Sequence, residues 1–171
     1  MMHRILFSLS VVIDSVTKYI SYFTAFILVL LVVLIVYDAT ARYLFSSGHI
    51  ALQELEWHLF DVIIMLSIAY TLKENSHVRV DIFYNTFSLK NQALVNIIAT
   101  LFFILPFASL LVYMGIGFVE LSFVQNEVSS NPGGLTHRWI VKSLMPLAFV
   151  FLGLQALSEL FRQIKLYRSA S

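Results

Sequence analysis

The stretch NQALVNIIATLFFILPFASLLVYMGIGFV, residues 91–119, contains no charged side chain. A helix needs about 20 apolar residues to cross a hydrocarbon core of about 30 Å, and this segment exceeds that length. We therefore predict a membrane-spanning helix that is tilted or that extends beyond the bilayer. The whole composition agrees, because 59% of the residues are hydrophobic and 12% are charged, which is typical of an integral membrane protein.

Three further segments are long and apolar enough to cross a bilayer, at residues 19–37, 52–72 and 140–161. Residues 3–18 precede them and place apolar residues at helical spacing, without an A-x-A-like site that would mark a signal peptide. This pattern predicts an amphipathic helix in the membrane interface. We therefore predict an all-α membrane protein with four transmembrane helices and an N-terminal interfacial helix, forming a single membrane domain over residues 1–171.

The basic residues predict the orientation of the helices. Eight of the eleven Lys and Arg residues lie on the side of the membrane that holds both termini. Because basic loops stay in the cytoplasm, both termini are predicted to be cytoplasmic. Trp57 and Trp139 would then lie at the outer ends of their helices, where indole rings favour the membrane–water boundary. The eight residues are Arg4, Lys18, Lys73, Arg79, Lys90, Arg162, Lys165 and Arg168, and the other three are Arg42, Arg138 and Lys142.

The second predicted span begins with the polar sequence LQELEWHLFDV. Glu54, His58 and Asp61 are spaced i, i+4 and i+7, so they share one face of a helix, whereas Glu56 points elsewhere. Ionisable groups are costly in lipid and usually face a bundle interior, a water-filled cavity or another chain. These three residues and Gln155, the main deep amide of the last span, are candidates for a partner interface. We hypothesise that the polar face is buried against a partner or against this chain's other helices.

Two functions are conceivable for this face of the helix, a proton relay and a haem-binding site. Histidine side chains commonly take part in proton transfer, and His58 lies between two carboxylates, but the other spans carry no ionisable residue near their centres except tyrosines. Of the five histidines only His58 falls inside a span, so a bis-histidine haem site is not supported. We therefore predict no catalytic residue, no metal and no cofactor, and we expect that the protein is not an enzyme.

Composition narrows the remaining function classes. The chain has no cysteine, which excludes disulfides, thiolate metal sites and cysteine nucleophiles. A formal net charge of +1 gives no reason to expect nucleic acid as a partner. No phosphate-binding motif of the P-loop or dinucleotide type is present in the sequence.

Two connections carry recognisable signals. NPGGL predicts a turn, because Asn-Pro starts turns and Gly133 and Gly134 adopt positive φ freely. Thr136 follows as an expected N-cap of the last helix. HVRVD, residues 77–81, alternates apolar and charged residues around Arg79, which is typical of a membrane interface. We expect Arg79, Gly133 and Gly134 to act at loops or interfaces.

Several single residues predict helix geometry. Asp38 lies four residues before Arg42, the favourable order for an ion pair if the first helix continues that far. Pro106 and Pro146 lack a backbone donor and should bend the third and fourth spans. Gly115 offers a small surface where two helices can approach closely.

Five segments of the sequence, taken in their order along the chain, resemble those of a known family. The chain is similar, over about residues 19–162, to the small membrane subunit of the tripartite ATP-independent periplasmic (TRAP) transporters. The likeness is greatest to the branch described for mannitol or chloroaromatic compounds, although Thr136 stands where many relatives have proline. The segments are ARYLF (41–45), ALQELEWHLF (51–60), AYTLKENSHVRVDIFY (69–84), NPGGLTHRWIVKSLMP (131–146) and LQALSEL (154–160).

The resemblance implies a role and partners. Such a subunit forms an obligate complex with a large membrane subunit that carries the substrate and sodium sites, and a soluble periplasmic binding protein delivers the solute. A sodium gradient drives uptake, usually of an organic acid, into a bacterial or archaeal cell across the inner membrane. The small subunit would act as a scaffold for an elevator-like transport domain and would contact membrane lipids. The alternatives are a freestanding four-helix carrier or channel and a membrane anchor of a redox complex.

Overall fold

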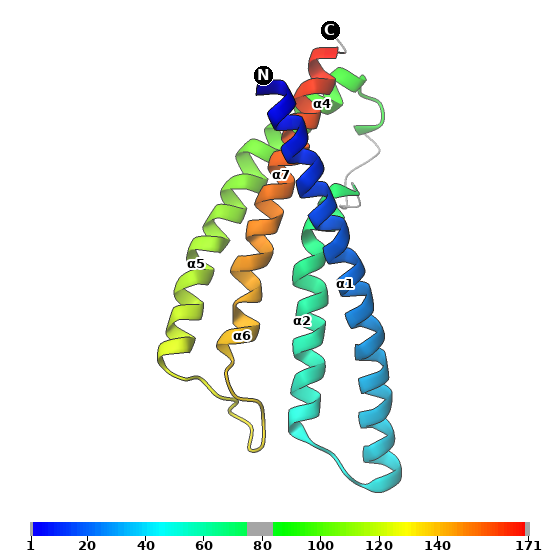
Figure 1. The fold of residues 1–171 in the computed structure, drawn as a ribbon, viewed down its shortest axis with the longest axis vertical. Helices are drawn as coiled ribbons and strands as arrows, with labels where there is room; N and C mark the ends of the chain where they lie inside the picture. Colours follow the sequence, from blue (N-terminus) through cyan, green and yellow to red (C-terminus); the bar gives the residue numbers. More distant parts are fainter. Residues whose placement is uncertain (1, 75–83, 170–171) are drawn as a thin grey trace.

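The computed structural model describes residues 2–74 and 84–169, and every regular element in these ranges is helical (Figure 1). The HVRVD segment with Arg79 lies outside the described residues. The elements are α1 (Met2–Phe45), α2 (Ile50–Lys73), α4 (Leu89–Ala99), the π-helical turn η1 (Thr100–Ile104), α5 (Leu105–Val124), α6 (Trp139–Lys142) and α7 (Leu144–Ser169).

Four helical segments are long and apolar enough to cross a membrane, which confirms the predicted all-α, four-span architecture. Figure 1 shows both chain termini at one end of the molecule, which we call the terminal end. The connections at residues 46–49 and 125–138 lie at the other end, which we call the loop end. The four segments are Ser10–Phe45, Ile50–Lys73, Leu89–Val124 and Trp139–Ser169.

Helix α1 differs from expectation, because the separate interfacial helix at residues 3–18 is instead the first part of one continuous helix. No glycine or proline occurs between Met2 and Phe45 to end it. At about 1.5 Å per residue the helix is roughly 66 Å long, so part of it must lie beyond a hydrocarbon core of about 30 Å. Because α1 also continues past the first predicted span, the expected ion pair between Asp38 and Arg42 forms.

The third span contains the bend that Pro106 predicts. Five residues before Pro106 adopt π-helical geometry, and the backbone N–H of Leu105 donates to the carbonyl of Thr100, five residues back. Pro106 has no N–H to offer Phe102, and the wider turn accommodates its ring. The span is also longer than predicted: Ser88 caps its start by accepting from the Asn91 N–H at 3.3 Å, and α5 continues to Val124.

The fourth span is interrupted near its start by Pro146. Ser143 separates the short α6 from α7, and Pro146 lacks the N–H that would reach the carbonyl of Lys142. Here α5 approaches closely, because a Cβ placed on Gly115 would lie 3.1 Å from Cδ of Pro146. The absence of a side chain at Gly115 therefore permits this helix contact, as the sequence predicts.

Helix α7 is the central element and packs against α1, α2, α4 and α5. Its buried face consists mainly of small or polar residues, and Leu152 and Ala156 join Leu72 and Ala108 in the apolar core. In Figure 1 the α1–α2 pair and the α5–α7 pair diverge toward the loop end. Much of the remaining apolar surface therefore faces outward, as expected for helices surrounded by lipid or by another membrane protein.

The close approach at Gly115 leads to a stability prediction. Replacing Gly115 with Leu should lower the free energy of unfolding by about 1–3 kcal/mol, because the new side chain must displace Pro146. Gly117→Leu is the matched control, since nothing lies within 4 Å of a Cβ at Gly117. Thermal unfolding in detergent measures both variants. Equal melting temperatures for the two would contradict the assigned contact.

Candidate functional site

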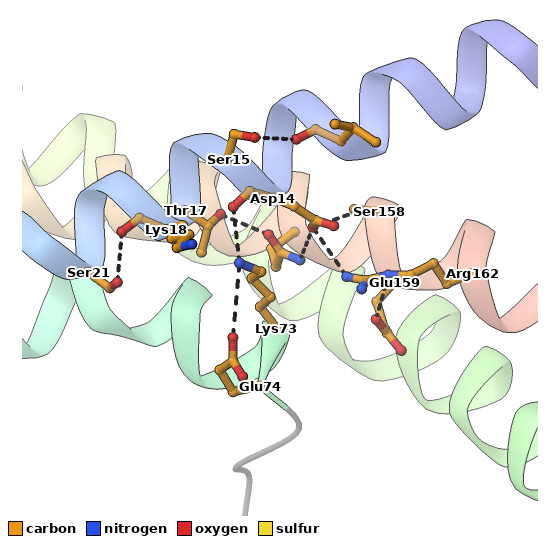
Figure 2. Close-up of polar contacts among 12 residues, drawn as sticks. Asp14, Ser15, Thr17, Lys18, Ser21, Lys73, Glu74, Ser158, Glu159 and Arg162 are labelled. Atoms are coloured by element: carbon orange, nitrogen blue, oxygen red, sulfur yellow. Dashed lines mark hydrogen bonds and ion pairs between the residues drawn. The ribbon is translucent and has the colours of Figure 1, made fainter.

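A polar network joins α1 to α7 near the terminal end (Figure 2). The carboxylate of Asp14 accepts hydrogen bonds from Nε2 of Gln155 at 2.9 Å, Oγ of Ser158 at 3.2 Å and Nη2 of Arg162 at 3.2 Å. Thr17 donates to Oε1 of Gln155 at 2.8 Å. Both ends of the Gln155 amide are thus used between the two helices.

The network extends to α2 and along α7. Lys73, at the end of α2, donates from Nζ to the backbone carbonyl of Asp14 at 3.2 Å. Arg162 also pairs with Glu159 at 3.2 Å, and Gln163 donates to Glu159 at 2.6 Å. Three helices are therefore held together by one connected set of polar contacts, in which each charged group has an opposite charge or a donor nearby.

This network changes the interpretation of Gln155. The sequence indicates it as a partner contact, but its side chain is 0% exposed and is bonded within the chain, so it is not available to a partner surface. Sequence reasoning missed Asp14 altogether. The signal was a pair of matched spacings: Asp14 and Thr17 lie three residues apart on α1, and Gln155 and Ser158 lie three apart on α7.

At the loop end, Glu54 of α2 holds the connection between α5 and α6. Its carboxylate accepts hydrogen bonds from the Ser129 hydroxyl, from Nδ2 of Asn131 at 3.2 Å and from the backbone N–H of Leu135 at 2.6 Å. We call this arrangement the Glu54 clamp. One carboxylate of the predicted polar face is therefore satisfied inside the chain.

The glycines of NPGGL make the Glu54 clamp possible. Gly133 has φ of +79°, and the N–H of Gly134 donates to the carbonyl of Asn131 at 3.0 Å, so the predicted turn is present. A Cβ on Gly134 would lie 2.7 Å from Oε2 of Glu54, a distance that real side chains do not tolerate. Gly134 is therefore needed for the carboxylate to approach the loop.

The expected capping role of Thr136 is wrong. The residue before α6 is Arg138, which makes no side-chain cap, and Thr136 instead pairs with Nδ1 of His137 at 2.8 Å. His137 has a positive φ of 59°, which turns the chain between Thr136 and the helix. A capping hydroxyl must sit directly at the helix start, and this turn prevents it.

Other polar groups at the loop end are also engaged. Asp38 is 2% exposed and pairs with Arg42 within α1, so Arg42 has a structural role there. Glu56 turns away from the Glu54 clamp and interacts electrostatically with both of these residues. Beyond α5, Glu127 forms an ion pair with Lys142, whose hydrogen bond holds the pKa of that carboxyl below its ordinary value.

The two tryptophans differ in environment. Trp57 is 67% exposed and meets only the edge of Phe60, whereas Trp139 packs edge-on against Phe123 with ring centroids 5.4 Å apart. Trp57 therefore offers its ring to the surroundings of the helix, and Trp139 joins α6 to α5. Trp139 is the first residue of α6, and Trp57 lies in the loop-end part of α2, seven residues after its first residue.

A groove of about 410 Å³ opens between α2 and the chain from residue 130 to α6. His58 and Asp61 line it and are half-buried, and neither has a hydrogen bond or an ion pair with any residue in the described part of the chain. Within residues 2–74 and 84–169 no group of acidic, histidine or cysteine side chains is arranged to hold a metal ion. The groove is lined by Ile50, Gln53, Glu54, Trp57, His58, Asp61, Ser130, Asn131, Arg138 and Val141.

Comparison with known proteins identifies the family. A family model described as the DctQ component of tripartite ATP-independent periplasmic transporters matches residues 31–166. The chain belongs to the DctQ family. It is therefore the small component of a tripartite transporter, whose other parts are a large membrane subunit and a binding protein. A search of curated proteins found no match. The region that matches the DctQ model includes the Glu54 clamp and Gln155, but it begins after Asp14.

The hydrogen bonds between Asp14 of α1 and the side chains of α7 predict that a substitution of Asp14 lowers the stability of the protein. Replacing Asp14 with Ala removes the carboxylate that accepts hydrogen bonds from Gln155, Ser158 and Arg162 and should lower the free energy of unfolding by about 1–3 kcal/mol. Ser15→Ala is the control, because the exposed Ser15 hydroxyl bonds only within α1. Thermal unfolding in detergent tests this, and an unchanged melting temperature for Asp14→Ala would contradict it.

The Glu54 clamp predicts a local change in hydrogen exchange. Glu54→Ala should accelerate exchange of the Leu135 amide by about tenfold or more, because that N–H loses its acceptor and a typical charge-assisted bond contributes at least about 1.4 kcal/mol. Glu56→Ala, on the same helix but away from the loop, should leave this amide unchanged. Exchange measured by mass spectrometry would argue against the clamp if both variants behaved alike.

Proposed function

We propose that this chain is the scaffold subunit of a sodium-coupled, binding-protein-dependent TRAP transporter that imports an organic acid or a related small solute. The observation that carries the proposal is the DctQ match over residues 31–166, which covers most of the four-span architecture. The NPGGL-x-x-RW and LQELEW patterns of the sequence favour the branch described for mannitol or chloroaromatic compounds. Carboxylates are the first solutes to test.

The use of the polar side chains supports a scaffold rather than a carrier. Asp14 and Glu54 each bond to another element of this chain and hold helices or a loop in place, and Asp38 is paired with Arg42 within α1. Carriers need convergent polar groups and unwound helix segments that coordinate ions near the membrane centre. In the π-helical turn η1 the Leu105 N–H still donates to the Thr100 carbonyl, and the core cluster that Ile104 and Leu105 pack against is apolar.

The broad apolar faces support an extended contact with the large membrane subunit and with lipid. Large side chains such as Phe103, Phe107 and Tyr113 project outward from the η1–α5 helix, and Val29 and Val33 do so from α1. Such surfaces suit a subunit that enlarges the static part of a transporter within the membrane. Both termini are then cytoplasmic, as the basic residues predict, and the connection held by the Glu54 clamp faces the binding protein.

Reconstitution tests this proposal. This chain and the large subunit are reconstituted together into lipid vesicles. These vesicles should accumulate a small carboxylate only when the binding protein and an inward sodium gradient are both present. Vesicles that contain this chain alone should accumulate none. A panel of small carboxylates with mannitol as the neutral comparison identifies the solute class. Gradient-driven accumulation by this chain alone would overturn the scaffold role in favour of a freestanding carrier.

A further inference from the structure

We propose that Asp61 and the groove around it receive a basic side chain from a membrane helix of the large subunit. The inference rests on the proposed function, because it requires a second membrane subunit beside this one. Two carboxylates on one face of α2 differ in their hydrogen-bond partners. Glu54 and Asp61 share that face, yet Glu54 has three donors within the chain, and Asp61 has none among the described residues.

The position of Asp61 makes a missing partner costly. Asp61 lies seven positions after Glu54, so it is about 10 Å further along α2 from the loop end. Val62 and the uncharged residues that follow place it inside a span of Ile50–Lys73. A carboxylate at such a position is strongly unfavourable in lipid unless a cation or several donors approach it.

Within the described part of the chain, the basic residues near the groove form no ion pair with Asp61. Arg138 lies at the start of α6 and acts electrostatically on Glu54 and Glu127, both at the loop end. Lys142 forms its ion pair with Glu127. The remaining lining residue from α6 is Val141, which has no polar side chain to offer. The groove therefore presents the Asp61 carboxylate and the His58 ring without an ion-pair partner among the described residues, and its one basic lining residue, Arg138, acts on the carboxylates of the loop end.

The shape of the groove suits one long side chain. Its volume of about 410 Å³ lies at the small end of the range for binding pockets, and it is open rather than enclosed by this chain. His58 lies one turn from Asp61 on the same face and can provide a second polar contact to an incoming ammonium or guanidinium group. Charge complementarity thus selects a Lys or Arg of a neighbouring helix as the occupant.

The absence of native cysteine permits a direct test of occupancy. His58→Cys places a single thiol in the groove, and Ser47→Cys places one at an exposed position between α1 and α2. A small thiol reagent should label both positions in the isolated chain held in lipid nanodiscs. In the complex with the large subunit, only the Ser47→Cys thiol should remain reactive. Protection of His58→Cys already in the isolated chain would overturn the proposal in favour of a lipid headgroup.

Charge changes test the chemistry of the contact. Asp61→Arg should reduce recovery of the large subunit in copurification by about tenfold or more, and Asp61→Asn should reduce it less. Glu120→Arg is the matched control, because Glu120 is an exposed acid near the loop end of α5, outside the groove. Thermal unfolding of the isolated chain establishes that each variant is folded. The milder Asp61→Asn variant supplies the measurement if Asp61→Arg does not fold.

The outcomes separate this inference from the proposed function. If the unmodified chain does not copurify with the large subunit, the proposed function itself fails. If the unmodified chain copurifies and Asp61→Arg does so equally well, only the inference fails. Equal losses for Asp61→Arg and Glu120→Arg would also overturn it, because the effect would then belong to added positive charge and not to the groove.

Discussion

A polar side chain inside a bilayer must find its hydrogen-bonding partner in protein, because lipid provides none. This constraint determines how the helices of the DctQ-family chain are arranged. Asp14 joins α1 to α7 through three donors, and Glu54 joins α2 to the connection that leads into α6. Each contact fixes a helix at a particular position along its axis, since a shift by one turn would leave a half-buried carboxylate without its donors.

Apolar packing contributes differently. Lipid tails are as apolar as leucine, so burying aliphatic side chains between helices gains little relative to lipid. The contacts along α7 accordingly use small residues, with Ala148 and Ala156 fully buried and Gly115 against Pro146. Small side chains allow the helices to approach closely and gain dispersion energy over a long contact. Packing therefore sets how close the helices lie, and the polar contacts set their register.

The sequence predicted what depends on local pattern. Apolar length located all four spans, the spacing of Asp38 and Arg42 predicted an ion pair, and NPGGL predicted its turn. Contacts between distant segments were not predictable in the same way. Asp14 and Gln155 are 141 residues apart, and nothing in either helix alone identifies the other as its partner. Family resemblance did not help with Asp14 either, because the matched region begins after it.

The difference at residues 3–18 also arises from contacts between distant segments, which a local pattern does not reveal. The amphipathic pattern of residues 3–18 correctly indicated a helix, but a pattern cannot tell whether a helix lies in the interface or continues into the next span. The decision depends on whether the polar side chains have partners in protein. Here Asp14 and Thr17 hydrogen-bond to Gln155 of α7, and these contacts hold the first part of α1 in line with the span that follows. The polar contacts that join α1, α2 and α7 lie near the terminal end. At the loop end, Glu54 of α2 bonds to the connection between α5 and α6 and not to a third helix. The helix pairs can therefore diverge toward the loop end, as Figure 1 shows. The groove at Asp61 lies between α2 and the chain from residue 130 to α6.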